Sequence, residues 1–243
     1  MTETTQRKHV GLVQLGVEPY EPMQQLQNRL AERRQQGLIG DLLLRLEHTP
    51  VITLGRRADP SHILAPPEVL VREGIEVQQT ERGGDVTYHG PGQLVGYPIL
   101  HLPSYNLGAS DYMHRLEEVI MRTLADFGLA THRREGIIGV WVGENKIAAL
   151  GVRIKRGVTL HGFALNVNPD MRHWSFIIPC GITDGWVTSL AQELAQPPEM
   201  AEVRRRIAHH FAELFQVELV PTTLEAQTEN VKATEQKEAE REG

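Results

Sequence analysis

The chain has 243 residues, 40% of them hydrophobic, which is enough for a core in one sizeable domain or two small ones. Its formal net charge is −6, so no overall positive field is available to hold a nucleic-acid backbone, and we expect no nucleic-acid partner. No apolar run reaches the roughly 18 residues of a membrane span, and the N-terminus lacks the apolar segment of a signal peptide. We therefore expect a cytoplasmic protein that has no membrane partner.

Metal-binding patterns are missing from the sequence. There is one cysteine, Cys180, so an intramolecular disulfide is excluded. The histidines are scattered singly apart from His209-His210, and no His-Glu-x-x-His or Cys-x-x-Cys spacing occurs. We expect no metal and no cofactor.

In the first third of the chain, alternation of apolar residues predicts strands and their spacing by three or four predicts helices. The expected strands are 9–16, 41–48, 51–54 and 75–80, and the expected helices are 21–36 and 66–73.

A stretch rich in glycine and polar residues follows, from Arg82 to Pro98, and it contains five glycines. Glycine allows positive φ and lets a ligand approach the main chain, so such runs line binding sites. An elaborate hairpin loop between two strands is the alternative interpretation. The stretch continues into a strand at 93–100, and Pro98 predicts that this strand lies at a sheet edge or is bulged there.

The second half alternates less regularly. Ser110 is a plausible N-cap for an amphipathic helix that ends at Gly128. Turn residues then separate strands 136–142, 146–154 and 158–167 into a meander, and helices 188–194 and 198–216 and strand 217–220 follow.

This order of elements predicts the α+β class with a mixed, largely antiparallel sheet flanked by helices, because regular βαβ alternation and phosphate-binding glycine motifs are both missing. We expect one domain over residues 1–221. Residues 222–243 carry six glutamates against three basic residues and few aliphatics, which predicts an acidic, disordered tail.

The lone cysteine has two interpretations. A single cysteine is often a small buried hydrophobe, but Cys180 lies between Pro179 and Gly181 in a turn, where a thiol is better exposed. As a nucleophile, a thiol with a pKa of about 8.5 needs a nearby cation or base. His89, His161 and Lys146 are the candidates on residue chemistry alone.

Four segments carry a family resemblance. Residues 82–97, read as Arg-Gly-Gly-x-x-Thr-Tyr-His-x-x-Gly-Gln-x-x-x-Tyr, resemble the signature of the lipoyl(octanoyl) transferases. Residues 47–56 are also characteristic of that family. Residues 143–153, around Lys146, resemble its catalytic-lysine segment, and residues 179–182, around Cys180, resemble its catalytic-cysteine segment.

The resemblance implies a fold similar to the catalytic domain of biotin and lipoate-protein ligases. It implies that Cys180 is the acyl-thioester nucleophile and that Lys146 is the cation that lowers the thiol pKa and shuttles protons. His89 would lie beside the thioester, positioning it or stabilising charge on its carbonyl. The implied substrate-binding residues are Arg82, Gly83, Gly84, Asp85, Val86, Thr87, Tyr88, His89, Ala149, Leu150, Gly151, Gly162, Phe163 and Ala164.

The implied reaction is a ping-pong acyl transfer without ATP. The donor is octanoyl acyl carrier protein. The acceptor is a lysine of the lipoyl domains of 2-oxoacid dehydrogenase E2 subunits and of the glycine cleavage H protein, in the first step of endogenous protein lipoylation. A monomer is expected.

Three other functions remain open on sequence grounds. An ATP-dependent lipoate- or biotin-protein ligase of the same fold would require ATP and would not need the cysteine. A non-catalytic module that binds lipoylated or acylated partners would keep its function in Cys180→Ser. A cysteine hydrolase is the third, although Cys180 has no recognisable peptidase context.

Overall fold

The structure is a computed structural model and describes residues 7–179 and 185–225. Cys180 and residues 226–243 lie outside the described residues. Within the described part, no helix is both long and apolar enough to span a membrane.

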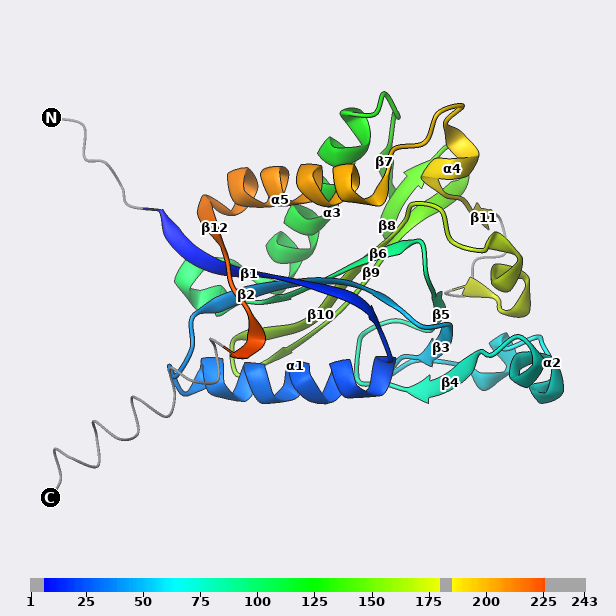
Figure 1. The fold of residues 1–243 in the computed structure, drawn as a ribbon, viewed down its shortest axis with the longest axis horizontal. Helices are drawn as coiled ribbons and strands as arrows, with labels where there is room; N and C mark the ends of the chain where they lie inside the picture. Colours follow the sequence, from blue (N-terminus) through cyan, green and yellow to red (C-terminus); the bar gives the residue numbers. More distant parts are fainter. Residues whose placement is uncertain (1–6, 180–184, 226–243) are drawn as a thin grey trace, which may run out of the picture.

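A large mixed sheet forms the centre of the molecule (Figure 1). Its order is β12-β1-β2-β6-β10-β9-β8-β7, and β11 pairs with β9. The two β1 pairings and the β11 pairing are parallel, and the other pairings are antiparallel. The strands are β1 (Lys8–Glu18), β2 (Asp41–His48), β6 (Gln93–Ile99), β7 (His132–Arg134), β8 (Ile137–Val142), β9 (Asn145–Lys155), β10 (Val158–Asn166), β11 (Trp186–Val187) and β12 (Val217–Pro221).

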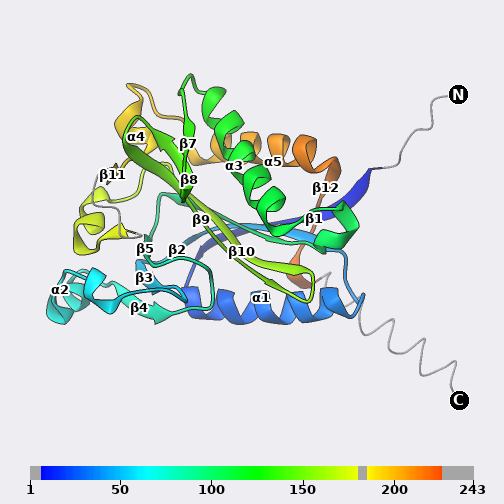
Figure 2. The same cartoon turned by 180° about the vertical axis from the view of Figure 1, so that it is seen from behind.

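A second sheet of three strands lies at one end of the large one. It has the order β4-β3-β5, with β3 (Val51–Leu54), β4 (Glu76–Gln79) and β5 (Val86–His89). β3 is parallel to β4 and antiparallel to β5. The short helix α2 (Pro67–Arg72) lies beside this sheet in both cartoon views (Figures 1 and 2).

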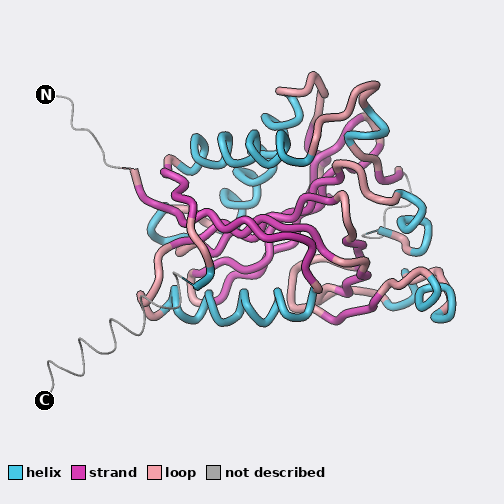
Figure 3. Tube along the Cα trace, in the orientation of Figure 1, coloured by secondary structure: helices cyan, strands magenta, loops and turns pink. Residues whose placement is uncertain are grey.

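Helices cover both faces of the large sheet (Figure 3). α1 (Tyr20–Gln35) covers one face, and α3 (Ala109–Ala125) and α5 (Met200–Phe215) pack together on the other. Three buried apolar clusters result, one on each face of the large sheet and one around the small sheet. The remaining helical turns are α4 (Leu190–Glu193), η1 (Pro60–His62), η2 (Leu102–Tyr105) and η3 (Met171–Phe176).

This architecture confirms the expected α+β class and the largely antiparallel sheet. The meander is present as β8, β9 and β10. The sequence reading missed β5, β7 and β11, which are only two to four residues long. It also placed the start of α3 wrongly, since the N-cap is Gly108 and Ser110 lies within the first turn.

The expectation that Pro98 marks an edge strand or a bulge was wrong. β6 lies between β2 and β10, and its pairing with β2 runs without a shift from Leu46 to Leu42. Pro98 is tolerated because the β6–β10 ladder ends at Gly96. At Pro98 the Thr159 hydroxyl donates to the Pro98 carbonyl at 2.7 Å, and backbone bonding resumes where the Thr159 amide donates to the Leu100 carbonyl at 3.0 Å.

The described residues after β12 return to the domain. The Thr222 amide donates to the Leu12 carbonyl at 3.0 Å, and Leu224 packs against the cluster on the α1 face. The division into a domain of residues 1–221 and a disordered tail stays a prediction.

Candidate functional site

The loop before β5 is held against β3 by one buried arginine. The Arg82 guanidinium donates from Nη2 to the Thr53 carbonyl at 2.7 Å and to the Thr53 hydroxyl at 2.8 Å. Gly84 has φ +92°, and a Cβ on Gly55 would lie 2.4 Å from the Gly84 carbonyl oxygen. These two glycines therefore allow a close contact that other residues would block.

β5 turns alternate side chains in opposite directions, as a strand must. Thr87 and His89 line a cavity, whereas Val86 and Tyr88 belong to the apolar cluster around the small sheet. The Tyr88 hydroxyl lies 2.7 Å from Nδ1 of His173, and burial raises the pKa of this phenol. Residues 86–89 of the glycine-rich stretch thus contribute alternately to the cavity lining and to the apolar cluster.

The cavity opens beside β5. It lies between the loop before β5, the N-terminal residue of α1 and strands β5, β6, β9 and β10. Its lining residues are Tyr20, Arg82, Gly83, Gly84, Thr87, His89, Val95, Tyr97, Ala149, Leu150, Gly151, His161, Gly162, Phe163 and Ala164. The lining residues from β9 and β10 are mostly apolar or glycine, which suits an aliphatic chain, and we call this the aliphatic cavity.

Most of the substrate-binding residues implied by the resemblance meet at this cavity. Asp85, Val86 and Tyr88 do not line it. The Asp85 carboxylate instead lies 2.6 Å from Nδ1 of His62 and accepts from the Asp59 amide at 3.0 Å. Asp85 therefore fixes the loop rather than the cavity wall.

A group of buried rings lies at the cavity, and the sequence analysis gave no role to its members Tyr20, His48 and Tyr97. Tyr20 stacks on His89 with ring centroids 6.0 Å apart, and His48 lies edge-on to His89 at 5.7 Å. Nδ1 of His48 lies 2.8 Å from the Glu18 carbonyl and Nε2 lies 2.7 Å from the Tyr97 hydroxyl. Burial lowers the pKa of His48 to about 4, so this ring is neutral and accepts from Tyr97.

His161 has a left-handed backbone conformation, which is uncommon for a residue other than glycine. Its φ is +58°, and its buried Nδ1 has no hydrogen-bond partner among the described residues. Its amide donates to Oε1 of Gln27 at 2.7 Å. Burial, with Arg82 and Arg153 adding to it, lowers the pKa of His161 to about 3. Strain of this kind is typical of functional sites.

Lys146 is buried near the start of β9. Its Nζ lies 5.6 Å from the Trp141 ring centroid, and its side chain passes over Gly139 on β8. Its carbonyl accepts from the Thr188 amide at 3.0 Å, next to the β9–β11 pairing. The burial sets Lys146 apart from the solvated lysines usual at turns.

A second, smaller cavity lies beside Lys146, and its lining includes Gln93, Asn166, Trp174, Pro179 and Val187. Thr87, Ala149 and Ala164 line both cavities. The aliphatic cavity and Lys146 therefore share a wall, and Pro179, the residue before Cys180, lies at the Lys146 end. Cys180 itself lies outside the described residues.

A chain of buried amides connects these parts. Nδ1 of His89 lies 2.7 Å from Oε1 of Gln93, and Nε2 of Gln93 donates to Oδ1 of Asn166 at 2.9 Å. Nδ2 of Asn166 donates to the Thr188 carbonyl at 2.9 Å. The chain thus runs from His89 at the cavity to β11 and the segment bonded to Lys146.

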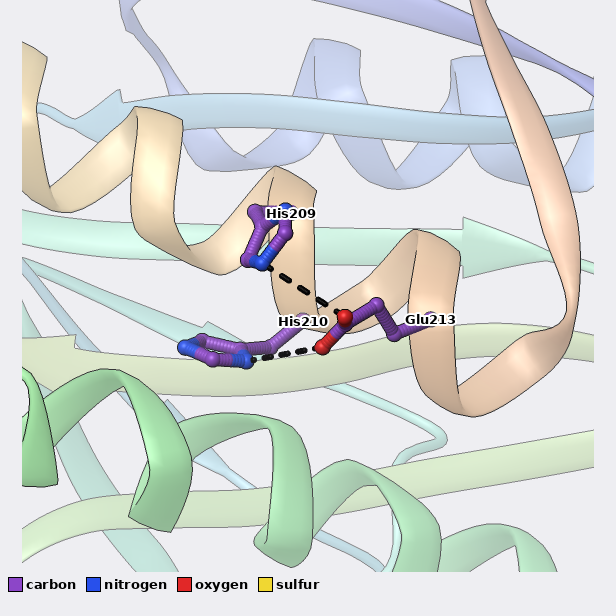
Figure 4. Close-up of side chains that lie close together, drawn as sticks. All are labelled: His209, His210 and Glu213. Atoms are coloured by element: carbon purple, nitrogen blue, oxygen red, sulfur yellow. Dashed lines mark ion pairs between the residues drawn. The ribbon is translucent and has the colours of Figure 1, made fainter.

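The His209-His210 pair belongs to an ion-pair cluster on α5 (Figure 4). Oxygens of the Glu213 carboxylate lie 3.6 Å from Nε2 of His209 and 3.5 Å from Nδ1 of His210. Nε2 of His210 lies 2.9 Å from Asp126, which Arg206 also contacts at 3.5 Å. These contacts link α5 to the end of α3, and the groups are already paired with one another.

Comparison with known proteins places this chain in a class of enzymes. Residues 18–212 match the model of the lipoyl protein ligase A/B catalytic domain. An octanoyltransferase of Alkaliphilus metalliredigens is 44% identical over 88% of this chain and 99% of its own length. One from Chloroflexus aurantiacus is 49% identical over 84% of this chain and 93% of its own length.

Solved structures share the fold at lower identity. A lipoate-protein ligase A bound with ATP has a TM-score of 0.73 at 18% identity and covers 93% of both chains. A bipartite lipoate protein ligase from Thermoplasma acidophilum has a TM-score of 0.70 at 18% identity, covering 93% of this chain and 91% of that one. At such identity, these two structures establish the fold alone.

The relatives define an acyltransferase, and its fold is shared with the lipoate-protein ligases. The chain belongs to the lipoyl protein ligase A/B catalytic domain family. The expected family and the expected enzyme class are thereby confirmed.

Proposed function

We propose that this protein transfers an octanoyl group from octanoyl acyl carrier protein to the acceptor lysine of lipoyl domains, through a thioester on Cys180. These acceptors are the lipoyl domains of 2-oxoacid dehydrogenase E2 subunits and the glycine cleavage H protein. We place the reaction in the cytoplasm and expect a monomer. The name octanoyltransferase, shared by relatives at 44% and 49% identity, supports the acyl group.

One observation carries the proposal. The aliphatic cavity and the buried Lys146 share the wall formed by Thr87, Ala149 and Ala164, and the residue before Cys180 lies at the Lys146 end. An acyl chain lying in this cavity would direct its thioester carbon toward Lys146 and Pro179, the residue before Cys180. Such placement supplies the proximity that acyl transfer requires.

The first half of the reaction would load the enzyme. The Cys180 proton passes to Lys146, and the thiolate attacks the thioester carbon of the donor. The new sulfur–carbon bond forms as the carrier's sulfur–carbon bond breaks, and the carrier thiolate leaves with the proton from the Lys146 ammonium. The cation beside the thiol would favour the thiolate.

The second half would release the product. The neutral amine of the acceptor lysine attacks the enzyme thioester, forming the amide bond while the bond to Cys180 sulfur breaks. Lys146 takes the amine proton and returns it to the Cys180 thiolate. The thioester already carries the activation, so the balance needs no ATP.

The test is the intact mass of the protein after brief incubation with octanoyl acyl carrier protein and no acceptor, in parallel with Cys180→Ser and Lys146→Ala. We expect a hydroxylamine-labile octanoyl adduct on the wild type, none on the cysteine variant, and slow formation on the lysine variant. Absence of the adduct, with transfer only when ATP and free acid are supplied, would instead identify a ligase. No transfer under either condition would leave a binding module.

A further inference from the structure

The buried amide chain between His89 and Thr188 has only one consistent set of directions. The Thr188 carbonyl can only accept, so Nδ2 of Asn166 must face it and Oδ1 must face Gln93. Nε2 of Gln93 then donates to Oδ1 of Asn166 and also to the Tyr88 carbonyl at 3.2 Å. Turning either amide over would place oxygen against oxygen in a buried site, at considerable cost.

This direction determines the protonation of His89. Oε1 of Gln93 is an acceptor, so Nδ1 of His89 must carry a hydrogen and donate it. Burial, followed by His48 and Arg82, holds the pKa of His89 well below its usual value, against a smaller opposing effect of Gln93. His89 is therefore a neutral ring whose Nε2 carries a lone pair.

The packing around the ring keeps that lone pair in place. Tyr20 stacks on one face of His89, and His48 contacts it edge-on. His161 and Arg82, the other titratable groups close enough to influence it, line the same cavity. Among the described residues no hydrogen-bond partner reaches Nε2, which lies on the ring edge opposite Gln93.

We propose that Gln93 and Asn166 are positioning residues that hold His89 as a hydrogen-bond acceptor at the cavity wall, and that the group it accepts is the N–H of the incoming lysine amine. This rests on the proposed function. The reacting atoms of an acyl thioester carry no hydrogen-bond donor, whereas the acceptor amine brings one. A lone pair on Nε2 would repel an oxyanion, so the carbonyl-stabilising role considered for His89 from sequence is disfavoured.

The first test measures the tautomer directly and needs no substrate. Long-range proton–nitrogen spectra of protein labelled at histidine nitrogen, assigned with His89→Asn, report which ring nitrogen carries hydrogen. We expect Nδ1–H for His89 at neutral pH in the wild type. In Gln93→Leu we expect the preference for Nδ1–H to be lost. A wild-type Nε2–H tautomer, or an imidazolium, would overturn the proposal.

The second test separates the two half-reactions. In Gln93→Leu, octanoyl loading from the carrier is expected to stay within about threefold of wild type, whereas aminolysis by a lipoyl domain falls about tenfold, the effect of one hydrogen bond. Equal loss in both half-reactions would indicate a merely structural role. If the wild type is never loaded, the proposed function fails while the tautomer result stands independently.

A charge variant supplies the third readout. Gln93→Glu keeps the side-chain shape but puts an oxygen where Nε2 donated to Asn166 and to the Tyr88 carbonyl, so the variant should lose stability. The carboxylate beside Nδ1 raises the pKa of His89, so the acid limb of the aminolysis rate should move up by about one pH unit or more. Gln25→Leu, an exposed glutamine on α1 bonded to Glu21, is the matched control and should leave the profile unchanged. An unshifted limb in Gln93→Glu would contradict the assignment.

Discussion

At the scale of single residues, the position of Lys146 depends on a neighbour with no side chain. The Lys146 side chain passes over Gly139, whose amide donates to Oε1 of Glu117 at 3.0 Å. Glu117 is held in turn by Arg133 at 2.9 Å. The backbone at Gly139 is therefore held in place, and the Lys146 side chain leaves no room there for a Cβ atom.

Gly139→Ala should displace Lys146. A Cβ there would lie 2.3 Å from Cε of Lys146 and 2.8 Å from the Ala148 carbonyl, at a φ of +148°. We expect octanoyl transfer to fall about tenfold or more and the free energy of unfolding to fall by about 1–3 kcal/mol. Rates from the carrier assay and denaturant unfolding measure the two effects.

Gly136→Ala is the matched control, because Gly136 has φ +76° but open space around its Cβ position. It should lose stability through backbone strain alone and keep its transfer rate. If both variants lost transfer equally, the contact with Lys146 would not be the cause.

At the scale of elements, Arg82 joins the loop before β5 to β3. Its guanidinium donates to the Thr53 carbonyl from Nη2 and to the Thr53 hydroxyl from Nε and Nη2. Arg82 thus acts in large part by holding the loop before β5 in place beside the cavity. A lysine cannot reproduce this planar set of donors.

Arg82→Lys should therefore loosen the loop over the cavity. We expect the KM for the octanoyl donor to rise about tenfold and the free energy of unfolding to fall by about 2–3 kcal/mol, because several buried hydrogen bonds are lost. Arg57→Lys, an exposed change in the neighbouring loop whose backbone bond to Gly84 remains, is the control. A normal KM in Arg82→Lys would contradict this role.

The sequence predicted the elements that have a regular spacing of apolar residues over many consecutive positions. α1, α3 and α5 and the meander strands followed from apolar spacing and turn residues. β5 was not predicted, because four residues in a glycine-rich stretch become a strand only by pairing with distant β3. The prediction of a sheet edge or bulge at Pro98 was wrong because the Thr159 hydroxyl, 61 positions away, donates to the Pro98 carbonyl in place of a backbone amide of β10. Such long-range partners leave no local signal.

At the scale of the whole molecule, the topology assembles the cavity from segments that are distant in sequence. Tyr20 begins α1, His48 ends β2, His89 ends β5 and His161 lies in β10. The motifs indicated His89 and the glycine-rich walls from β9 and β10. The 47–56 segment contained His48 without giving it a role, and no motif covered Tyr20. Each of the two enters the site only through strand order and helix packing.

Gathering neutral histidines in one buried group makes the stability of the whole domain depend on pH. Burial lowers the pKa of His48 to about 4 and of His161 to about 3, against about 6.5 in the unfolded chain. Below pH 6.5 His48 and His161 become protonated in the unfolded chain but stay neutral in the folded protein. Stability that is fully present above pH 6.5 is therefore lost progressively as the pH falls toward 4.

The free energy of unfolding, measured with denaturant at pH 7.5, 5.5 and 4.5, should decrease along that series. Each such histidine contributes up to about 1.4 kcal/mol per pH unit to the slope within this window. His48→Gln cannot take up the proton, so its stability should be lower at pH 7.5 but should depend less steeply on pH. His132→Gln, at an exposed position on β7, should keep the wild-type slope. An unchanged slope in His48→Gln would mean that other groups cause the acid sensitivity.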